Sequence, residues 1–301
     1  MTTLGAPSGL IPVLATPFTE TGVLDVPSLR SLVEFQLSCG VDGLAVFGMA
    51  SEGFALTSSE RVKILREVRA VAGAQMPIIA GINATSIQTA LEQAAAAVEA
   101  DQLMVLPPYL VKPAPDQVVD FYAEVTEHAQ LPVMVQDAPG PTGVAVSVAA
   151  ITELSHVDGV TSVKVEAPPT PAKVAEVRAR TDASFAVLGG QNAQALIEEY
   201  DNGAVGTMPA CEFADVLRVV LDDYSAGRRA VARAGFARLL PLIHLGIRPG
   251  QAWAVHKEVL RRRGVIASAA VRSPARELDA VTGKALTEIL DELSLPIWRR
   301  P

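Results

Sequence analysis

GVTSVKVE, residues 159–166, is a short β-rich run near the middle of the chain that ends on Lys164, Val165 and Glu166. A lysine that closes an apolar strand directs its amine toward whatever lies beyond the strand. In a (β/α) barrel this place is the mouth of the active site, because barrel enzymes build their sites at the C-terminal ends of the strands. A partly buried lysine there becomes a nucleophile toward ketones. Alone, however, the run fits better with a lysine that merely reaches water, so the rest of the chain has to decide.

Strand-like and helix-like segments alternate along most of the sequence. The predicted strands are short and rich in Val, Ile and Leu, as is typical of strands buried on both faces; they are residues 11–16, 43–47, 77–81, 103–106, 132–136, 160–164, 185–188 and 205–208. Amphipathic segments follow them at 27–38, 58–72, 86–100, 116–129, 147–155, 171–179, 192–202 and 215–226. Eight such units predict an α/β fold, a TIM (β/α)8 barrel over residues 1–226. An open doubly wound sheet is the alternative, although no Gly-x-Gly-x-x-Gly opens the first helix.

Capping residues predict where the first two helices begin, and the loss of the strand pattern marks the C-terminal part of the chain. Pro27 starts the first helix, and Ser58 or Ser59 with Glu60 is the expected cap of the second. Beyond residue 226 the strand signal disappears, and residues 228–245, 251–263 and 276–293 predict three helices. We interpret residues 227–301 as a C-terminal three-helix appendage packed on the barrel, because they lack a core large enough for an independent domain.

Composition and charge exclude several classes of function. Half of the 301 residues are hydrophobic, 19% are charged, and the net charge is −8. This charge argues against nucleic acid and anionic membranes as partners, but one local cation is enough to hold a small anionic substrate. The apolar run 94–98 is far too short to span a bilayer.

The cysteines and histidines suggest neither a disulfide framework nor a metal site. Cys39 and Cys211 form no spaced motif, which favours a reduced, cytoplasmic protein. The histidines stand at no ligand spacing, and we interpret all of them as structural or surface residues; they are His128, His156, His244 and His256. No metal site is predicted.

Polar clusters follow four of the predicted strands. The turn after strand two can hold a carboxylate through Ala50, Ser51 and its backbone N–H groups, and Glu52 follows there. Lys164 and Glu166 fall on the same side of their strand. Further candidates are Gln136 and Asp137 after strand five, Gly189 after strand seven, where barrels often bind anions, Tyr109 after strand four, and Thr207 on strand eight. Ordinary turns, helix caps and an ion pair would equally explain each cluster.

Several motifs together resemble a known superfamily. They are Ala15-Thr16-Pro17-Phe18, the turn 48–52, Pro107-Pro108-Tyr109 and Lys164. Over nearly its whole length the chain is similar to the dihydrodipicolinate synthase and N-acetylneuraminate lyase superfamily. The resemblance implies that Lys164 forms a Schiff base with a 2-oxo acid, that the strand-two turn holds the acid's carboxylate, and that no separate cofactor takes part. It also implies a homotetramer, a dimer of dimers.

The sequence departs from the synthases and aldolases of that superfamily at important positions. Their strand-five tyrosine is Gln136 here, the arginine that follows it in the synthases is lost from residues 140–143, and Leu110 replaces a second tyrosine. The segments 51–55, 133–139, 164–168 and 264–268 instead resemble a hydro-lyase branch, the 2-keto-3-deoxy-L-arabonate dehydratases. Residues 81–84 and 190–192 differ from that branch too, and we expect them to contact the distal end of the substrate.

The resemblance predicts a Schiff-base lyase that dehydrates a 2-keto-3-deoxy sugar acid. Lys164 would condense with the C2 ketone, which acidifies the proton on C3, and an acid would help the C4 hydroxyl to leave. Glu52 and Glu166 are the titratable candidates for these transfers, and Gln136 and Ser51 would orient the substrate. The alternatives are a pyruvate-dependent aldolase with another base and a barrel that binds 2-oxo acids as a sensor without turnover.

Overall fold

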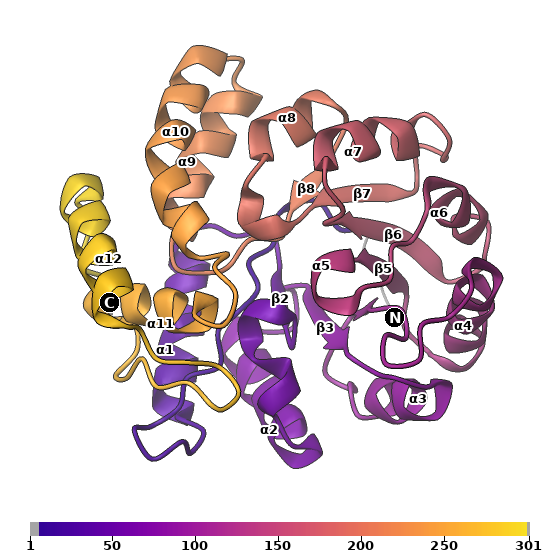
Figure 1. Ribbon diagram of the computed structural model, residues 1–301, viewed down its shortest axis with the longest axis horizontal. Coiled ribbons are helices and arrows are strands. Elements are labelled where there is room, and N and C mark those ends of the chain that lie inside the picture. Colours follow the sequence, from indigo (N-terminus) through magenta and orange to yellow (C-terminus); the bar gives the residue numbers. More distant parts are fainter. Residues whose placement is uncertain (1–5, 300–301) are drawn as a thin grey trace.

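The computed structural model describes residues 6–299 and confirms the barrel. In this part of the chain eight parallel strands follow the order β1-β8-β7-β6-β5-β4-β3-β2 (Figure 1). The strands are β1 (Gly9–Leu10), β2 (Leu44–Val46), β3 (Ile78–Ile82), β4 (Gln102–Val105), β5 (Val133–Asp137), β6 (Val160–Val165), β7 (Ala186–Gly189) and β8 (Gly206–Thr207). Val13 bridges Ala45 on one side and Ala210 on the other, which closes the sheet on itself and excludes the open doubly wound alternative.

The first strand is the least accurately predicted of the eight. Its ladder covers Gly9–Leu10, whereas the sequence pattern predicted residues 11–16. Pro12 has no N–H to donate, so regular pairing stops there and continues only as the isolated bridges of Val13.

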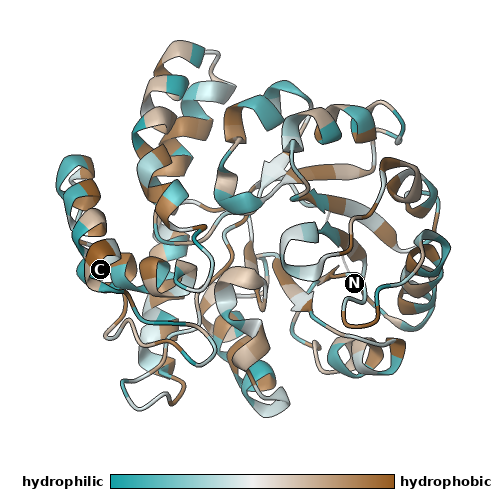
Figure 2. Cartoon of the chain, viewed as in Figure 1, coloured by the Kyte–Doolittle hydropathy of each residue, from teal (hydrophilic) through white to brown (hydrophobic). Residues whose placement is uncertain are grey.

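The strands separate two apolar regions because successive side chains point to opposite faces. A small cluster fills the barrel; its members are Ile11, Val13, Ala45, Ile79, Met104, Met134, Ala186, Leu188 and Met208. Val163 and Val165 of β6 belong instead to the larger cluster between strands and helices. Figure 2 shows the strands mostly brown and the outer helices mixed brown and teal, as this layering requires.

Helices cover the outside of the barrel, close to the predicted positions. They are α1 (Val26–Ser38), α2 (Ser58–Ala72), α3 (Ile87–Ala95), α4 (Pro115–His128), α5 (Pro139–Thr142), α6 (Val148–Leu154), α7 (Thr170–Arg178), α8 (Leu196–Asp201) and α9 (Ala214–Ser225). The cap of α2 is Thr57 rather than either predicted serine, because Thr57 and Glu60 hydrogen-bond each other's backbone N–H groups in a capping box. Short turns that the sequence did not predict are α5 and the 3-10 helices η1 (Met49–Ser51), η2 (Gly53–Ala55) and η3 (Gln191–Ala193).

The last three helices pack beside the barrel. They are α10 (Arg229–Leu245), α11 (Ala252–Arg262) and α12 (Ala280–Leu293). α10 packs on α9 and α12, and α11 lies against η1 (Figure 1). One apolar cluster runs through the barrel helices and reaches Leu242 of α10 and Leu286 of α12. The predicted division of the chain near residue 226 stays a prediction.

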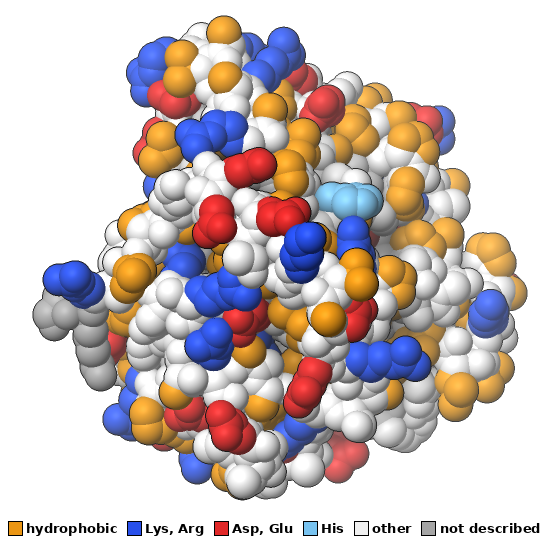
Figure 3. Space-filling model, turned by 60° about the vertical axis from the view of Figure 1, so that its left-hand side comes forward, with side chains coloured by type: hydrophobic (Ala, Val, Ile, Leu, Met, Phe, Trp, Pro, Cys, Tyr) orange, Lys and Arg blue, Asp and Glu red, His pale blue; other side chains and the backbone are white. Residues whose placement is uncertain are grey.

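The outer surface carries both signs of charge. On the face that Figure 3 turns toward the viewer, basic and acidic side chains are interspersed rather than gathered into one stripe. Within residues 6–299, no helix is both long enough and apolar enough to cross a membrane.

Arg272 ties the segment after α11 to the barrel. Its guanidinium donates to the carbonyls of Gly22, at 2.7 Å, and Ala55, at 3.0 Å, and pairs with Glu60 at 2.6 Å. The hydrogen bond from Arg272 is the main cause that lowers the pKa of Glu60 from 4.5 to about 2. Because the depressed pKa favours the ionised carboxylate in the folded state, this stabilisation is complete above pH 4.5 and disappears as the pH falls toward 2.

Replacing Arg272 should therefore destabilise the protein in a pH-dependent way. We expect Arg272→Ala to lower the free energy of unfolding by about 1–2 kcal/mol at neutral pH. The difference from wild type should shrink as the pH falls below 4.5, measured by urea unfolding at several pH values. Lys284→Ala, which removes an exposed pair with Glu288, is the control and should change little. A loss that is the same at every pH would show that Glu60 plays no part.

Candidate active site

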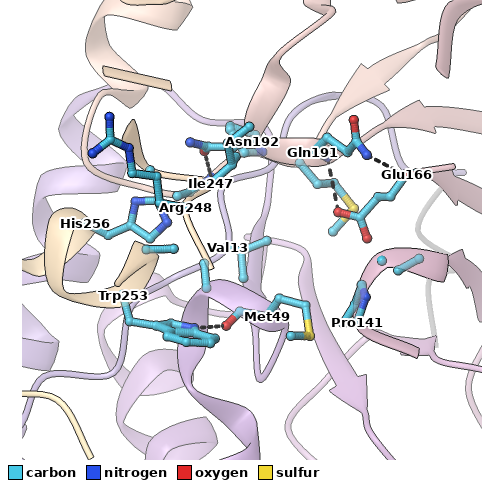
Figure 4. A pocket seen from close by; sticks show the side chains of 18 of the residues that line it. Val13, Met49, Pro141, Glu166, Gln191, Asn192, Ile247, Arg248, Trp253 and His256 are labelled. Carbon is cyan, nitrogen blue, oxygen red and sulfur yellow. Dashed lines mark hydrogen bonds between the residues drawn. The ribbon is translucent and has the colours of Figure 1, made fainter. Parts of the chain in front are cut away.

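A cavity of about 450 Å³ lies at the C-terminal ends of the strands (Figure 4). Its walls come from β6, from the loops after β5, β7 and β8, from η1, and from the segment that leads into α11. The polar side chains among its lining residues are Lys164, Glu166, Gln191, Asn192, Arg248, Trp253 and His256. Two remote parts of the chain, the barrel and the C-terminal helices, thus share one site.

Lys164 and Glu166 form a largely buried ion pair in this cavity. The Lys164 amine lies 3.2 Å from Oε1 of Glu166, and the two side chains are only 3% and 13% exposed. Gln136 is paired with Lys164 in the register of β5 and β6, and its amide donates to Oε2 of Glu166 at 2.8 Å. Gln136 is fully buried and is not among the residues that line the cavity, so the contact that the structure gives its side chain is with Glu166. Its predicted contact with the substrate stays a prediction.

A strained turn after β7 holds the other side of Glu166. Gln191, Asn192 and Ala193 have φ values of 46°, 56° and 60°, in the left-handed region that costs energy for residues other than glycine. In this conformation the Gln191 N–H donates to Oε1 of Glu166 at 3.2 Å, and the Gln191 side chain donates to the Glu166 carbonyl at 2.7 Å. The strained turn thus holds the Glu166 carboxylate in place through Gln191.

Asp137 points away from the cavity, contrary to the prediction. It follows Gln136 on the same strand, so alternation sends it outward, where it pairs with Lys173 at 2.6 Å and accepts the Val146 N–H at 3.0 Å. Burial raises the pKa of Asp137. We correct its role from substrate binding to joining β5 to α7.

Thr207 and Gly189 also lie outside the cavity lining, as neighbours in the register of β7 and β8. Thr207 is fully buried. A side chain at Gly189 would collide with the carboxylate of Glu199, whose Oε2 lies 1.8 Å from the position of a Cβ. The buried Glu199 therefore explains why glycine stands at 189, and the predicted anion contact of this residue stays a prediction.

The strand-two turn contributes less to the site than predicted. Only Met49 and Ala50 of η1 line the cavity. The Ser51 hydroxyl donates to the carbonyl of Leu14 at 2.6 Å. Glu52 is fully buried, pairs with Lys257 of α11 and accepts the Arg272 N–H at 2.9 Å. Glu52 therefore anchors the C-terminal helices, and the structure does not bring it to Lys164.

Tyr109 lines a second, smaller cavity of about 170 Å³ together with Phe54 and Asn83. Met49 and Pro141 line both cavities and stand between them. Tyr109 is thus a neighbour of the Lys164 site rather than part of its lining.

His256 is the main site residue that the sequence did not reveal. The sequence predicts a structural or surface residue, yet the His256 ring lines the cavity, and its Nδ1 lies 2.7 Å from Oε1 of Glu212. Trp253, on the same helix, donates to the Met49 carbonyl at 2.5 Å and contacts Phe54 edge to face. No sequence spacing links these residues to the barrel; only the packing of α11 on η1 does.

The described residues form no cluster that could bind a metal ion. Within residues 6–299, no three His, Cys, Asp or Glu side chains group as metal ligands would. Burial raises the pKa of the Cys39 thiol to about 12 and also raises that of Cys211, so both thiols are poor nucleophiles.

Comparison with known proteins identifies the family to which this barrel belongs. A model of the dihydrodipicolinate synthetase family matches residues 6–293. The chain belongs to this family. It is an enzyme family of lyases that act on small substrates.

Relatives within the family differ in their activities. The chain is 33% identical to an L-2-keto-3-deoxyarabonate dehydratase of Azospirillum brasilense, over 97% of this chain and 96% of that protein. It is also 33% identical to a 4-hydroxy-tetrahydrodipicolinate synthase of Methylococcus capsulatus, over 85% of this chain and 90% of that one. The crystal structure of a dihydrodipicolinate synthase from Rhodopseudomonas palustris superposes with a TM-score of 0.89 at 25% identity, over 95% of this chain and 97% of that chain.

Gly190 offers a direct test of how Glu166 is positioned. A Cβ at Gly190 would lie 2.3 Å from Cγ of Glu166, so Gly190→Ala should displace the carboxylate from Lys164. We expect imine formation with pyruvate to persist, while proton removal from the bound substrate falls about 10²-fold or more. Borohydride trapping and proton exchange measure the two steps. The matched control is Gly283→Ala, where an added Cβ meets no atom within 4 Å. If Gly190→Ala exchanged the substrate protons as fast as wild type, Glu166 would not be the group that removes them.

Proposed function

We propose that this family member is a Schiff-base hydro-lyase that dehydrates a 2-keto-3-deoxy sugar acid similar to 2-keto-3-deoxy-L-arabonate. The observation that carries the proposal is the pair of Lys164 and Glu166, which supplies a nucleophile and a single carboxylate within one largely buried cavity. The identity to the dehydratase of A. brasilense, which extends over almost the full length of both proteins, supports it.

The first step is condensation at Lys164. The amine attacks the C2 ketone of the substrate, and water leaves as the protonated imine forms. The imine carries a positive charge beside Glu166, whose carboxylate lies 3.2 Å from the nitrogen before reaction. Because both side chains are largely buried, this carboxylate stabilises the developing cation more strongly than it would in water.

The second step is elimination. Glu166 removes a proton from C3, and the electron pair of that bond moves toward the imine to give an enamine. The enamine then expels the C4 hydroxyl, which leaves as water with the proton that Glu166 has taken. Hydrolysis of the unsaturated imine frees Lys164. Glu166 is the only carboxylate among the described lining residues, so the proposal gives both proton transfers to it.

An aldolase is the second candidate, because the synthase of M. capsulatus is a relative of similar identity. In the resemblance that we described above, the aldolases use a strand-five tyrosine as their base. Position 136 holds an amide that cannot titrate, and the described lining residues include no tyrosine. This favours dehydration over cleavage. The homotetramer, the cytoplasmic location and the exact sugar acid stay predictions.

Lys164→Ala tests the covalent step. We expect this variant to lose borohydride trapping with pyruvate and with 2-keto-3-deoxy pentonates, because no other amine should form the imine. Lys112→Ala, which changes an exposed lysine, is the control and should trap like wild type. Mass spectrometry of the reduced peptide locates the label. A label that persists on another lysine in Lys164→Ala would refute the assignment.

A substrate screen on the wild-type protein separates the candidate functions. Products lighter than the substrate by one water support dehydration, and release of pyruvate would show an aldolase. Trapping without turnover of any 2-keto-3-deoxy acid would favour a sensor.

Gln136 should affect the elimination but not the imine. Gln136→Leu removes the hydrogen bond to Glu166, and we expect dehydration to fall about three- to tenfold while Lys164 is still trapped. Gln136→Glu places a second carboxylate against Glu166. Because like charges disfavour ionisation, the acidic limb of the pH–rate profile should move to higher pH. An unchanged rate in Gln136→Leu together with an unchanged profile in Gln136→Glu would contradict this role.

A further inference from the structure

The wall of the cavity that faces Glu166 carries a second polar group. Figure 4 shows His256 and Asn192 across the cavity from Glu166, with the segment that contains Ile247 and Arg248 beside them. Gly246, Asn192 and His256 all line the cavity. The chemistry at Lys164 uses none of these residues, so their placement calls for another explanation.

Glu212 fixes the tautomer of His256. The Glu212 side chain is fully buried, His256 is 4% exposed, and Nδ1 lies 2.7 Å from the Glu212 carboxylate. A carboxylate only accepts hydrogen bonds, so Nδ1 of the neutral ring must donate and Nε2 becomes an acceptor. The described residues give Nε2 no hydrogen-bond partner. The ring therefore offers one unused acceptor at the cavity wall.

Asn192 offers the complementary donor. Its strained backbone, with φ 56° and ψ 34°, is held because Oδ1 accepts the Ala210 N–H at 2.9 Å. With Oδ1 engaged, the amide group must present Nδ2 on its other side, and this atom is buried without a hydrogen-bond partner among the described residues. A buried donor without a partner is costly, and a ligand that accepts its hydrogen bond would remove that cost.

Gly246 makes room for both groups. A Cβ at this glycine would lie 2.8 Å from Cε1 of His256 and 3.0 Å from Nδ2 of Asn192. The His256 ring and the Asn192 amide thus both pack closely against Gly246, and a side chain at this position would displace them. The backbone of Gly246 has an ordinary helical conformation, φ −71° and ψ −2°, so its conformation does not require glycine.

We propose that His256, positioned by Glu212, and Asn192 form a subsite for an alcohol hydroxyl at the distal end of the substrate. A hydroxyl donates one hydrogen bond and accepts others, which matches an Nε2 acceptor beside an Nδ2 donor. A distal carboxylate would place an acceptor against the Nε2 acceptor and fits poorly. The subsite rests on the proposed function for its substrate class, a polyhydroxylated 2-oxo acid bound at its other end by Lys164.

The test compares 2-oxo-5-hydroxypentanoate with 2-oxopentanoate, which differ only in the distal hydroxyl. Neither carries a hydroxyl on C4, so neither can be dehydrated, and the readout is the concentration that gives half-maximal borohydride trapping at Lys164. We expect wild type to capture the hydroxylated acid at an about tenfold lower concentration. Equal half-saturation concentrations in wild type would overturn the proposal.

Two variants locate the preference. His256→Phe removes the acceptor, and Gly246→Ala displaces both polar side chains without replacing either; both should reduce the ratio of the two half-saturation concentrations to near one. Gly283→Ala, on α12, is the control and should keep the wild-type ratio. Circular dichroism and trapping with pyruvate check that each variant is folded, and Gly246→Ala decides the matter if His256→Phe does not fold. A preference that survives Gly246→Ala would refute the subsite.

The outcome is independent of the proposed dehydration. A wild-type preference that both variants abolish supports the subsite even if the substrate screen finds no hydro-lyase activity. Conversely, dehydration of a 2-keto-3-deoxy acid without any preference for the distal hydroxyl would refute the subsite alone.

Discussion

The largely buried ion pair between Lys164 and Glu166 is the constraint on which the rest of the site depends. Taking two charges out of water is expensive unless hydrogen bonds satisfy them, and the fold supplies these bonds to Glu166 from two neighbouring strands. Gln136 comes from β5 and Gln191 from the turn after β7. The strained turn and the missing side chain at Gly190 both follow from the need to hold one carboxylate beside one amine.

A supporting layer outside the barrel stabilises the strands that carry this pair. Asp137 joins β5 to Lys173 of α7, and Thr170 donates to Glu199 of α8 at 2.5 Å. Burial raises the pKa of Glu199 to about 7. On the other side, α11 is joined to the turn after β2 through the ion pair of Lys257 with Glu52 and the hydrogen bond of Trp253 to Met49. The site is therefore assembled from the barrel and the C-terminal helices together.

The sequence predicted the barrel and the place of Lys164, because short apolar runs and their spacing are local properties. It assigned both Gln136 and Asp137 to the mouth, although alternation along a strand sends only one of them inward. The ion pair of Glu52 could not be predicted, because its partner, Lys257, is remote in the sequence. His256 was overlooked for the same reason: Glu212 reaches it only through the packing of α11. Sequence periodicity predicts which side of a strand or helix a residue occupies. Contacts between residues that are distant in the sequence can be seen only in the three-dimensional structure.

The most direct test of the central claim is the exchange of pyruvate methyl protons in heavy water, followed by proton NMR. In the proposed mechanism, imine formation at Lys164 acidifies these protons, and Glu166 should remove them. We expect wild type to exchange them and Glu166→Gln to exchange them about 10²-fold or more slowly, while both proteins are still trapped by borohydride at Lys164. Equal exchange rates in the two proteins would contradict the claim that this ion pair is the catalytic centre.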